Sequence, residues 1–506
     1  MKIEELQQLY ALSPRVKALA EVLGEKSDEP VFLQGLVASG IAMTFAALNS
    51  STWGRSGGAP FLFIMQDAET AGYLYHDLQQ LLSDQQVLFF PSSYRRSVKY
   101  GQRDAASEIL RTEVLARMSS VEYIITYPEA VAELVVSKKR LDSRTLSLHT
   151  GQTLNTDNIT KTLREFGFRE VDYVYEPGQF ALRGSILDVF SFSNEYPFRI
   201  DFFGDDIDSI RTFEVENQLS RDKREQIEIV PELSGEVEDK ESLLTFLPKD
   251  TILVMKDQNY VREMIDKTYE EGFSEQAIRE RTEGATEEEQ AQILAAMRKE
   301  VQLTTGAQFQ REAQAFRTIL LSAATHQSTN NNHQSSLTFS VSPQPLFHKN
   351  FELLKQTLTD YQLRGYHIYI LADSQKQNER LKEILAPSTL NSPLFTPVEK
   401  TLHEGFIDHD LKLCVLTDHQ IFDRFHKYNL KSDKARSGKM ALTLKEIQQF
   451  EVGDYIVHID HGIGKFGGLV RMPINQNNQN NQSYQEMIKI IYQGGGAIYP
   501  TRSSRC

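Results

Sequence analysis

The sequence predicts a multidomain protein of mixed α/β and α+β class, and three observations predict it. Residues 1–145 alternate short apolar segments with helical segments, which is typical of a parallel sheet. From residue 146 one helical segment precedes several β-rich segments joined by turns, as in an α+β module. Glycines within the β-rich residues 447–506 favour a partial small β-barrel.

Composition limits the classes of function. At 506 residues the chain is too long for one hydrophobic core, and about three to five domains are expected. The formal charge of -14 argues against a protein that coats nucleic acid along its whole surface. The two cysteines, Cys414 and Cys506, can build neither a disulfide framework nor a cysteine-rich metal site. An acidic first helix and the lack of a long apolar run predict a cytoplasmic chain with no membrane anchor.

The first domain is expected to alternate strands with helices. The apolar runs predict strands at residues 30–33, 61–66, 87–90 and 123–126, and helical periodicity predicts helices at residues 70–82 and 105–118. Residues 231–336 return to this domain through a further strand, a charged helical run and a polar loop. The order predicts a parallel sheet kept as a scaffold.

A glycine loop follows the first predicted strand. Gly35 and Gly40 have the spacing of a phosphate-binding loop and lie between a strand and a helix. However, Ile41 and Ala42 stand where such a loop needs a lysine for the phosphates and a hydroxyl for magnesium. The sequence therefore predicts a degenerate, non-functional loop, and we expect no catalytic residue in this chain.

Residues 146–230 predict an α+β module inserted into the first domain. A helix is expected at residues 158–166, and strands are expected at residues 185–190, 197–203 and 207–215. Period-two alternation in the middle strand places three apolar side chains on the inner face: Phe198, Ile200 and Phe202. It places a mixed set on the outer face: Arg199, Asp201 and Phe203. The pattern leaves open a contact surface or a solvated face with one exposed ring.

The rest of the chain divides into three parts. Residues 337–425 predict a small α/β domain without a recognisable site, and residues 426–446 predict a basic linker. Residues 447–506 predict the small β domain, with a strand at 455–459. There, His458, Asp460 and His461 cross a strand-to-turn junction and do not converge, so no metal site is expected.

Two stretches of the module carry a family resemblance. The segments ALRGSILDVFSF and PFRIDFFGDDIDSIRTF resemble the domain shared by UvrB and the bacterial transcription-repair coupling factors (Mfd). In both, this domain docks onto the damage-sensing ATPase UvrA. Carried over by position, the resemblance implies UvrA contacts at Arg183, Arg199 and Phe203. Two of these residues lie on the outer face that alternation singles out.

A second resemblance lies in the last domain. The segment GDYIVHIDHGIGKFGGL resembles the opening of the CarD-like module by which coupling factors bind the β subunit of RNA polymerase. By position, the resemblance implies polymerase contacts at Leu469, Val470, Arg471 and Met472. An apolar edge offered by Phe466 and Leu469 would suit strand-to-strand docking. From Gly494 the sequence departs from the family, so a final strand is not expected and the barrel is expected to be truncated.

The resemblance implies the N-terminal half of a coupling factor. Such proteins recognise RNA polymerase stalled at DNA lesions, release it by ATP-driven translocation on double-stranded DNA, and recruit UvrA for nucleotide excision repair. The motor, with its ATP and magnesium, is expected outside this chain, which would be a scaffold rather than a helicase or hydrolase. Two alternatives stay open: a UvrB-like ATP-dependent helicase, and a CarD-like transcription regulator.

Overall fold

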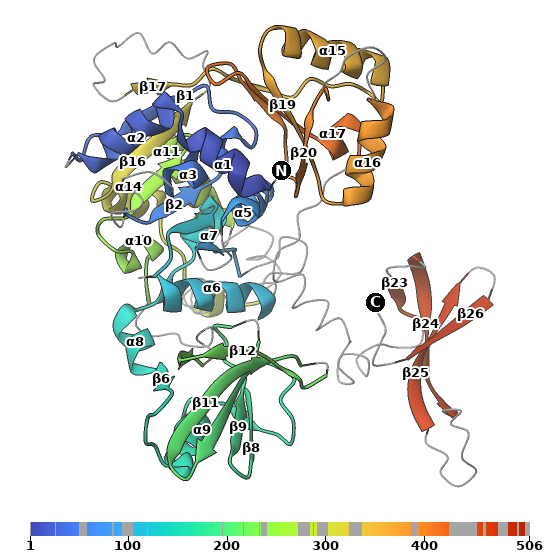
Figure 1. Ribbon diagram of the computed structural model, residues 1–506. Coiled ribbons are helices and arrows are strands. Elements are labelled where there is room, and N and C mark those ends of the chain that lie inside the picture. Colours follow the sequence, from blue (N-terminus) through green and yellow to red (C-terminus); the bar gives the residue numbers. More distant parts are fainter. Residues whose placement is uncertain are drawn as a thin grey trace. The chain divides into compact units, whose positions relative to one another are not determined.

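The computed structural model divides into two compact units, Met1–Tyr428 and Asn429–Cys506 (Figure 1). It describes residues 2–25, 27–49, 58–82, 86–93, 105–118, 120–194, 196–215, 217–231, 233, 240–271, 284–286, 288–290, 302–322, 336–385, 393–424, 453–458, 462–473, 484–492 and 495–500. The predicted basic linker, residues 426–446, lies outside these ranges, as does most of the charged run after residue 271.

The first unit is built on a parallel sheet of seven strands. In spatial order these are β17 (Ser336–Thr338), β1 (Val31–Gln34), β16 (Arg317–Ser322), β15 (Ile252–Met255), β2 (Phe61–Ile64), β4 (Tyr123–Thr126) and β3 (Val87–Phe89). Every neighbouring pair runs parallel. This confirms the α/β prediction. The sheet takes its edge strand β17 from residues on both sides of the expected boundary at 336/337.

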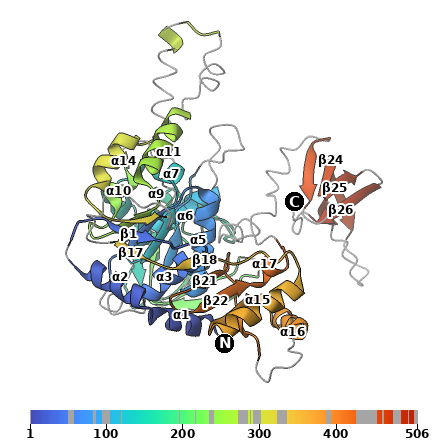
Figure 2. The same cartoon turned by 90° about the horizontal axis from the view of Figure 1, so that it is seen from above.

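Helices cover both faces of this sheet. The helices described in this domain are α1 (Ile3–Ala11), α2 (Pro14–Gly24), α3 (Gly40–Asn49), α5 (Ala68–Leu81), α6 (Ala105–Arg117), α7 (Pro128–Ala132), α8 (Lys138–Ser143), α10 (Leu243–Phe246), α11 (Gln258–Glu271) and α14 (Gly306–Ala313). Figure 2 shows α1, α2 and α3 on one side of the sheet and α11 and α14 on the other. Strands β2, β4 and β15 are buried at every residue, because a parallel sheet covered on both faces needs apolar side chains on both.

Two short antiparallel strand pairs lie where the α+β module joins this domain. Strand β5 (Val135–Val136) pairs with β14 (Lys240–Glu241), and β6 (Leu146–His149) pairs with β13 (Gln226–Ile229). Between them lies the helix α9 (Thr156–Glu165) and a six-stranded sheet. Its order is β12 (Ser220–Arg224), β11 (Asp206–Phe213), β10 (Phe198–Phe203), β9 (Ile186–Val189), β8 (Gln179–Arg183) and β7 (Arg169–Glu170).

The inner face of the six-stranded sheet packs against α9. The helix contributes Ile159 and Leu163, which are both buried among the apolar side chains of the strands. The predicted inner set of β10 is confirmed: Phe198, Ile200 and Phe202 are all buried in this core. The prediction of three strands was incomplete, because β7, β8 and β12 join the sheet as well.

The small α/β domain has a mixed sheet of five strands. Its order is β18 (Val341–Pro343), β21 (Phe406–Asp408), β22 (Leu413–Thr417), β19 (His367–Ala372) and β20 (Thr396–Glu399). The helices are α15 (Phe351–Leu363), α16 (Gln375–Ile384) and α17 (Asp418–Ile421). Cys414 is buried in this core, and burial raises the pKa of its thiol to about 12. The thiol is therefore protonated and unreactive at neutral pH.

The second unit contains an antiparallel sheet of four strands. These are β23 (Tyr455–His458), β24 (Gly462–Pro473), β25 (Tyr484–Tyr492) and β26 (Gly495–Pro500), in sequence order. The expectation that no strand follows Gly494 was wrong, because β26 pairs with β25 along its whole length. The described strands establish a sheet, so the partial barrel stays a prediction.

No helix in the described part of the chain is long and apolar enough to cross a membrane.

Candidate docking face of the inserted module

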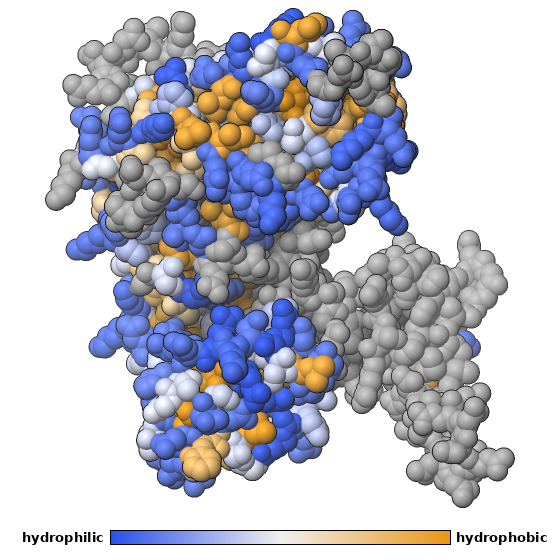
Figure 3. All heavy atoms as spheres, viewed as in Figure 1, coloured by the Kyte–Doolittle hydropathy of each residue, from blue (hydrophilic) through white to orange (hydrophobic). Residues whose placement is uncertain are grey.

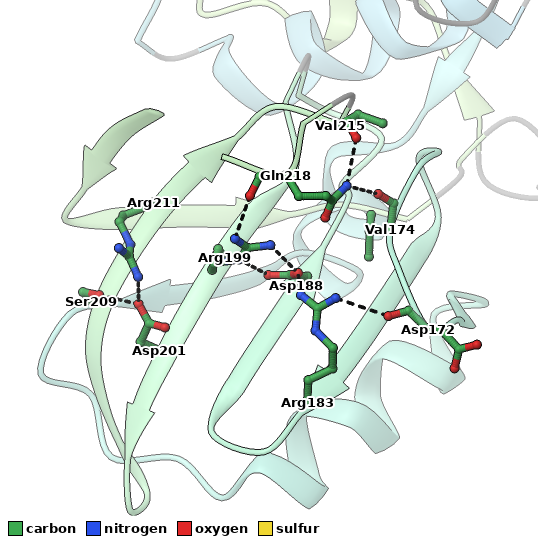
Figure 4. A network of polar contacts seen from close by, with 10 residues as sticks. All are labelled: Asp172, Val174, Arg183, Asp188, Arg199, Asp201, Ser209, Arg211, Val215 and Gln218. Atoms are coloured by element: carbon green, nitrogen blue, oxygen red, sulfur yellow. Dashed lines mark hydrogen bonds and ion pairs between the residues drawn. The ribbon is translucent and has the colours of Figure 1, made fainter. Parts of the chain in front are cut away.

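The outer face of the six-stranded sheet aligns charged side chains in one row. In register across β9, β10 and β11 lie Asp188, Arg199 and Arg211, and the uncharged Ala181 of β8 lies opposite Asp188. Side chains opposite one another in an antiparallel sheet are in contact range. Arg199 therefore has a carboxylate on one side and a second arginine on the other (Figure 4).

Asp188 is the centre of this row. Its side chain is fully buried, and both of its oxygens accept hydrogen bonds from Arg199: Nε donates to Oδ1 and Nη2 donates to Oδ2, each at 2.8 Å. Nη2 of Arg183 also pairs with Oδ2. A buried carboxylate is tolerated only when it is paired in this way. Two arginines therefore share one buried negative charge.

Arg199 uses most of its guanidinium inside the module. Besides its bonds to Asp188, Nη1 donates to the carbonyl oxygen of Gln218 at 3.0 Å, and the group lies 4.4 Å from the centre of the Phe213 ring. Hydrogen bonding to Asp188 raises the pKa of Arg199. Only 14% of the side chain is exposed. The structure thus gives this predicted contact residue an internal role, and its direct contact with UvrA stays a prediction.

Arg183 is more accessible. Its side chain is 33% exposed, Nη1 donates to the carbonyl oxygen of Asp172 at 3.3 Å, and the guanidinium lies 4.7 Å from the centre of the Tyr173 ring. The residue is tied to the sheet on one side and reaches solvent on another. It can therefore offer hydrogen-bond donors to a partner in a fixed orientation.

Phe203 is the most exposed large apolar residue of the module. The residue is 82% exposed at the end of β10, just before Gly204, whose φ of 67° permits the tight turn into β11. Tyr173, Tyr175 and Leu219 are also more than half exposed. In Figure 3 the surface of the module is otherwise largely hydrophilic, with separate hydrophobic groups. Rings on a polar surface are typical of a contact site.

Part of the outer face is shielded from solvent, which the sequence alone did not predict. A second apolar cluster covers it, made of Val174, Ala181, Phe190 and Phe213. Val174 belongs to the segment before β8, and Nε2 of Gln218 donates to its carbonyl oxygen at 3.4 Å. The signal was present in the sequence, because Phe190, just after β9, and Phe213, the last residue of β11, fall on the outer side by alternation. Their packing partner, however, comes from a loop.

The glycine loop after β1 has the local geometry of its class. Gly35 has a φ of 78°, and Gly40 begins α3. In a working loop the phosphates lie at the N-terminus of that helix. Here the small α/β domain packs against it: a Cβ added to Gly40 would lie 3.3 Å from Cγ1 of Val341 and 3.7 Å from the ring of Phe406.

Hydrogen bonds fix this contact between the two domains. Asp77 of α5 accepts from Oγ of Ser39 at 2.5 Å and from the backbone N–H of His403 at 2.6 Å. The backbone N–H of Glu404 donates to Oγ of Ser39 at 2.9 Å. Burial, followed by repulsion from Asp77, raises the pKa of Glu404. Ile41 and Ala42 are buried in the same region.

The predicted polymerase contacts lie on β24. Phe466 is 3% exposed, so its ring is not offered to a partner in this structure, unlike the apolar edge expected from the sequence. Val470 is half-buried. The backbones of Leu469, Arg471 and Met472 pair with β25, and their side chains lie outside what the structure describes.

A metal site is not formed by any described group of three or more His, Cys, Asp or Glu side chains. Of the residues considered for one in the sequence, Asp460 and His461 lie outside the described ranges.

The burial of Arg199 and the exposure of Phe203 predict different effects on stability. Arg199→Ala leaves the buried Asp188 with a single partner and should cost about 1–3 kcal/mol of unfolding free energy. Phe203→Ala should stay within about 0.5 kcal/mol of the parent. Denaturant unfolding followed by circular dichroism measures both. Equal losses for the two variants would contradict the assignment of Arg199 to an internal network.

Comparisons with known proteins match two regions of the chain. Residues 146–234 match the model of the UvrB interaction domain, and residues 450–501 match that of the CarD-like/TRCF RID domain. The first range contains the whole six-stranded sheet. The second runs through β26, which agrees with the correction of the expected departure at Gly494.

Relatives are similar along most of the chain. A transcription-repair-coupling factor of Bacillus subtilis (strain 168) is 22% identical over 571 residues, which covers 98% of this chain and 46% of that protein. Another, of Staphylococcus aureus (strain bovine RF122 / ET3-1), is 23% identical and covers 87% of this chain and 42% of that protein. The chain thus spans less than half the length of these relatives. With a UvrB interaction domain and a CarD-like domain, it resembles the N-terminal half of the transcription-repair coupling factors (Mfd).

Proposed function

We propose that this chain is a binding scaffold of transcription-coupled DNA repair. Its inserted module docks UvrA, and its CarD-like sheet binds the β subunit of RNA polymerase. The observation that carries the proposal is the docking face: two oriented arginines and an 82% exposed Phe203 lie within the residues that match the UvrB interaction domain.

The chemistry of the docking face suits a protein partner. The exposed ring of Phe203 supplies apolar area that becomes buried on binding. Arg183 supplies planar donors for carboxylate or carbonyl oxygens, with part of its orientation already fixed by Asp188. Fixing the donors beforehand lowers the entropy lost on association. Aromatic and arginine side chains are enriched among the residues that dominate binding energy.

The polymerase role rests on the second unit. Its match to the CarD-like/TRCF RID model supports binding of the polymerase β subunit through β24, with contacts at residues 469–472. Strands can bind a partner by extending its sheet. Strand β23 pairs only with residues 462–465 of β24, so within the described sheet residues 469–472 have a neighbouring strand, β25, on one side alone. Phe466 would support β24 from inside rather than touch the partner.

The activity of a whole coupling factor would include more than this chain. Recognition of stalled polymerase, its ATP-driven release and the recruitment of UvrA for nucleotide excision repair are the proposed context. ATP, magnesium and most contacts with double-stranded DNA would belong to motor domains outside the aligned part. We place the process in the cytoplasm, where bacterial DNA is transcribed and repaired.

We further propose that the glycine loop of this chain binds no nucleotide. The residues that would meet the phosphates and the magnesium are Ile41 and Ala42, and both are apolar. The N-terminus of α3 is in contact with Val341 and Phe406, close to where the phosphates would lie. These two observations disfavour a UvrB-like helicase as the function of this chain.

Two substitutions should separate the two binding activities. Phe203→Ala should weaken UvrA binding by at least about tenfold, because an exposed anchor ring is lost, and leave polymerase binding unchanged. Arg471→Glu should do the reverse. Immobilised chain and purified UvrA or RNA polymerase in biolayer interferometry give both affinities.

Each variant is the folding control for the other. A chain that has lost one activity and kept the other is folded in the retained part. The scaffold proposal fails if UvrA binds the parent chain and the Phe203→Ala variant equally well, or if the parent chain binds neither partner.

Nucleotide binding can be tested on the unmodified chain. A ligand that binds only the folded state raises the free energy of unfolding by about 2.7 kcal/mol when its concentration is 100 times its dissociation constant. We expect no shift in thermal unfolding when ATP is added together with magnesium, compared with magnesium alone. A saturable rise in melting temperature with ATP would restore the helicase alternative.

A further inference from the structure

We infer that Asp188 is the positioning residue of the docking face, and that Arg199 acts through Asp188 while Arg183 meets the partner. The inference rests on the proposed UvrA docking and goes beyond it. It assigns a role to an acidic residue that the sequence reading did not single out. It also divides the predicted contact residues by function, with Arg183 and Phe203 as contacts and Arg199 as support.

The burial of the side chains separates contact from support. Asp188 is fully buried, Arg199 is 14% exposed and Arg183 is 33% exposed. A buried carboxylate cannot meet a partner directly. It can act only through the two guanidiniums that it holds.

The hydrogen bonds that the two arginines donate also assign contact to Arg183 and support to Arg199. A guanidinium has five N–H donors. Three nitrogens of Arg199 donate inside the module, to Asp188 and to the carbonyl oxygen of Gln218, and its face packs on Phe213. Arg183 makes two such bonds, to Asp188 and to the carbonyl oxygen of Asp172, and is the more exposed of the two. Arg183 therefore has more donor capacity for a partner.

The row of charges explains why an acid is needed at this position. Arg199 lies directly opposite Arg211, and like charges in opposite positions are unfavourable. Arg211 is held by Asp201, which also accepts from Oγ of Ser209 at 2.8 Å. Asp188 plays the corresponding role for Arg199 and Arg183. Without it, Arg199 and Arg183 would both lose the carboxylate that holds them (Figure 4).

Tyr173 completes the support of Arg183. The residue is 51% exposed and the centre of its ring lies 4.7 Å from the guanidinium, so it holds the group from a second side. Asp188 and Tyr173 together leave Arg183 little freedom. The partner chemistry that fits is a carboxylate or main-chain carbonyl acceptor for Arg183, together with an apolar area that buries the exposed Phe203.

The test uses the whole chain and purified UvrA in surface plasmon resonance. Asp188→Asn keeps the shape but replaces an acceptor with a donor, so Arg183 should lose its orientation. The dissociation rate should rise about tenfold, because oriented charged hydrogen bonds act mainly on dissociation. Arg183→Lys keeps the charge without the planar fork and should give a similar rise. Asp208→Asn, an exposed acid of the same sheet, is the matched control and should leave the rate unchanged.

Coupling between Asp188 and Arg199 tests the indirect role. Arg199→Lys should raise the dissociation rate. The double variant with Asp188→Asn should dissociate no faster than the faster of the two single variants, because both substitutions act through one network. Multiplied effects in the double variant would instead show that Arg199 contacts UvrA by itself, which overturns the division.

The amplitude of the binding signal distinguishes a positioning role of Asp188 from a role in folding alone. A merely structural Asp188 would lower the fraction of chain able to bind without changing the dissociation rate. That result, or parental dissociation rates for both Asp188→Asn and Arg183→Lys, overturns the inference. If the parent binds UvrA and Phe203→Ala does not, while these variants behave as the parent, only this inference fails. If the parent does not bind, the proposed function itself fails.

Discussion

A buried carboxylate with two arginine partners organises the outer face of the inserted module. Asp188 has no exposed surface, so its charge must be met within the sheet, and Arg183 and Arg199 meet it. That pairing draws Arg199 inward over Phe213 and keeps Arg183 beside Tyr173. The face offered to a partner therefore consists of the groups that stay exposed once the charge of Asp188 has been paired inside the sheet.

The glycine loop follows a comparable logic in the first domain. A helix N-terminus that could bind phosphate is instead used for packing between two domains, through Gly40 and Phe406. Ser39 and Asp77, both buried, take hydrogen bonds from the backbone of residues 403–404 rather than serving a ligand. In both places, residues that resemble binding groups hold the scaffold together instead.

The sequence predicted those features that depend on local periodicity. Alternation in β10 identified the buried Phe198, Ile200 and Phe202 correctly, because one covered face imposes period two. The internal role of Arg199 was not predictable, because its partner Asp188 depends on the register between two strands. Strand β8 was missed because its five residues, QFALR, carry a weak alternation pattern. Strand β26 was missed because glycines disfavour strands locally and pairing with β25 overrides this.

Hydrogen–deuterium exchange of the chain with and without UvrA tests the central claim most directly, because it maps the contact without any substitution. The docking account predicts slower exchange on binding in the segment from Asp172 to Arg183 and around the turn at Gly204, where the exposed rings and Arg183 lie. The seven-stranded sheet and the second unit should exchange as before. Protection confined to those regions, with the docking face unchanged, would contradict the account.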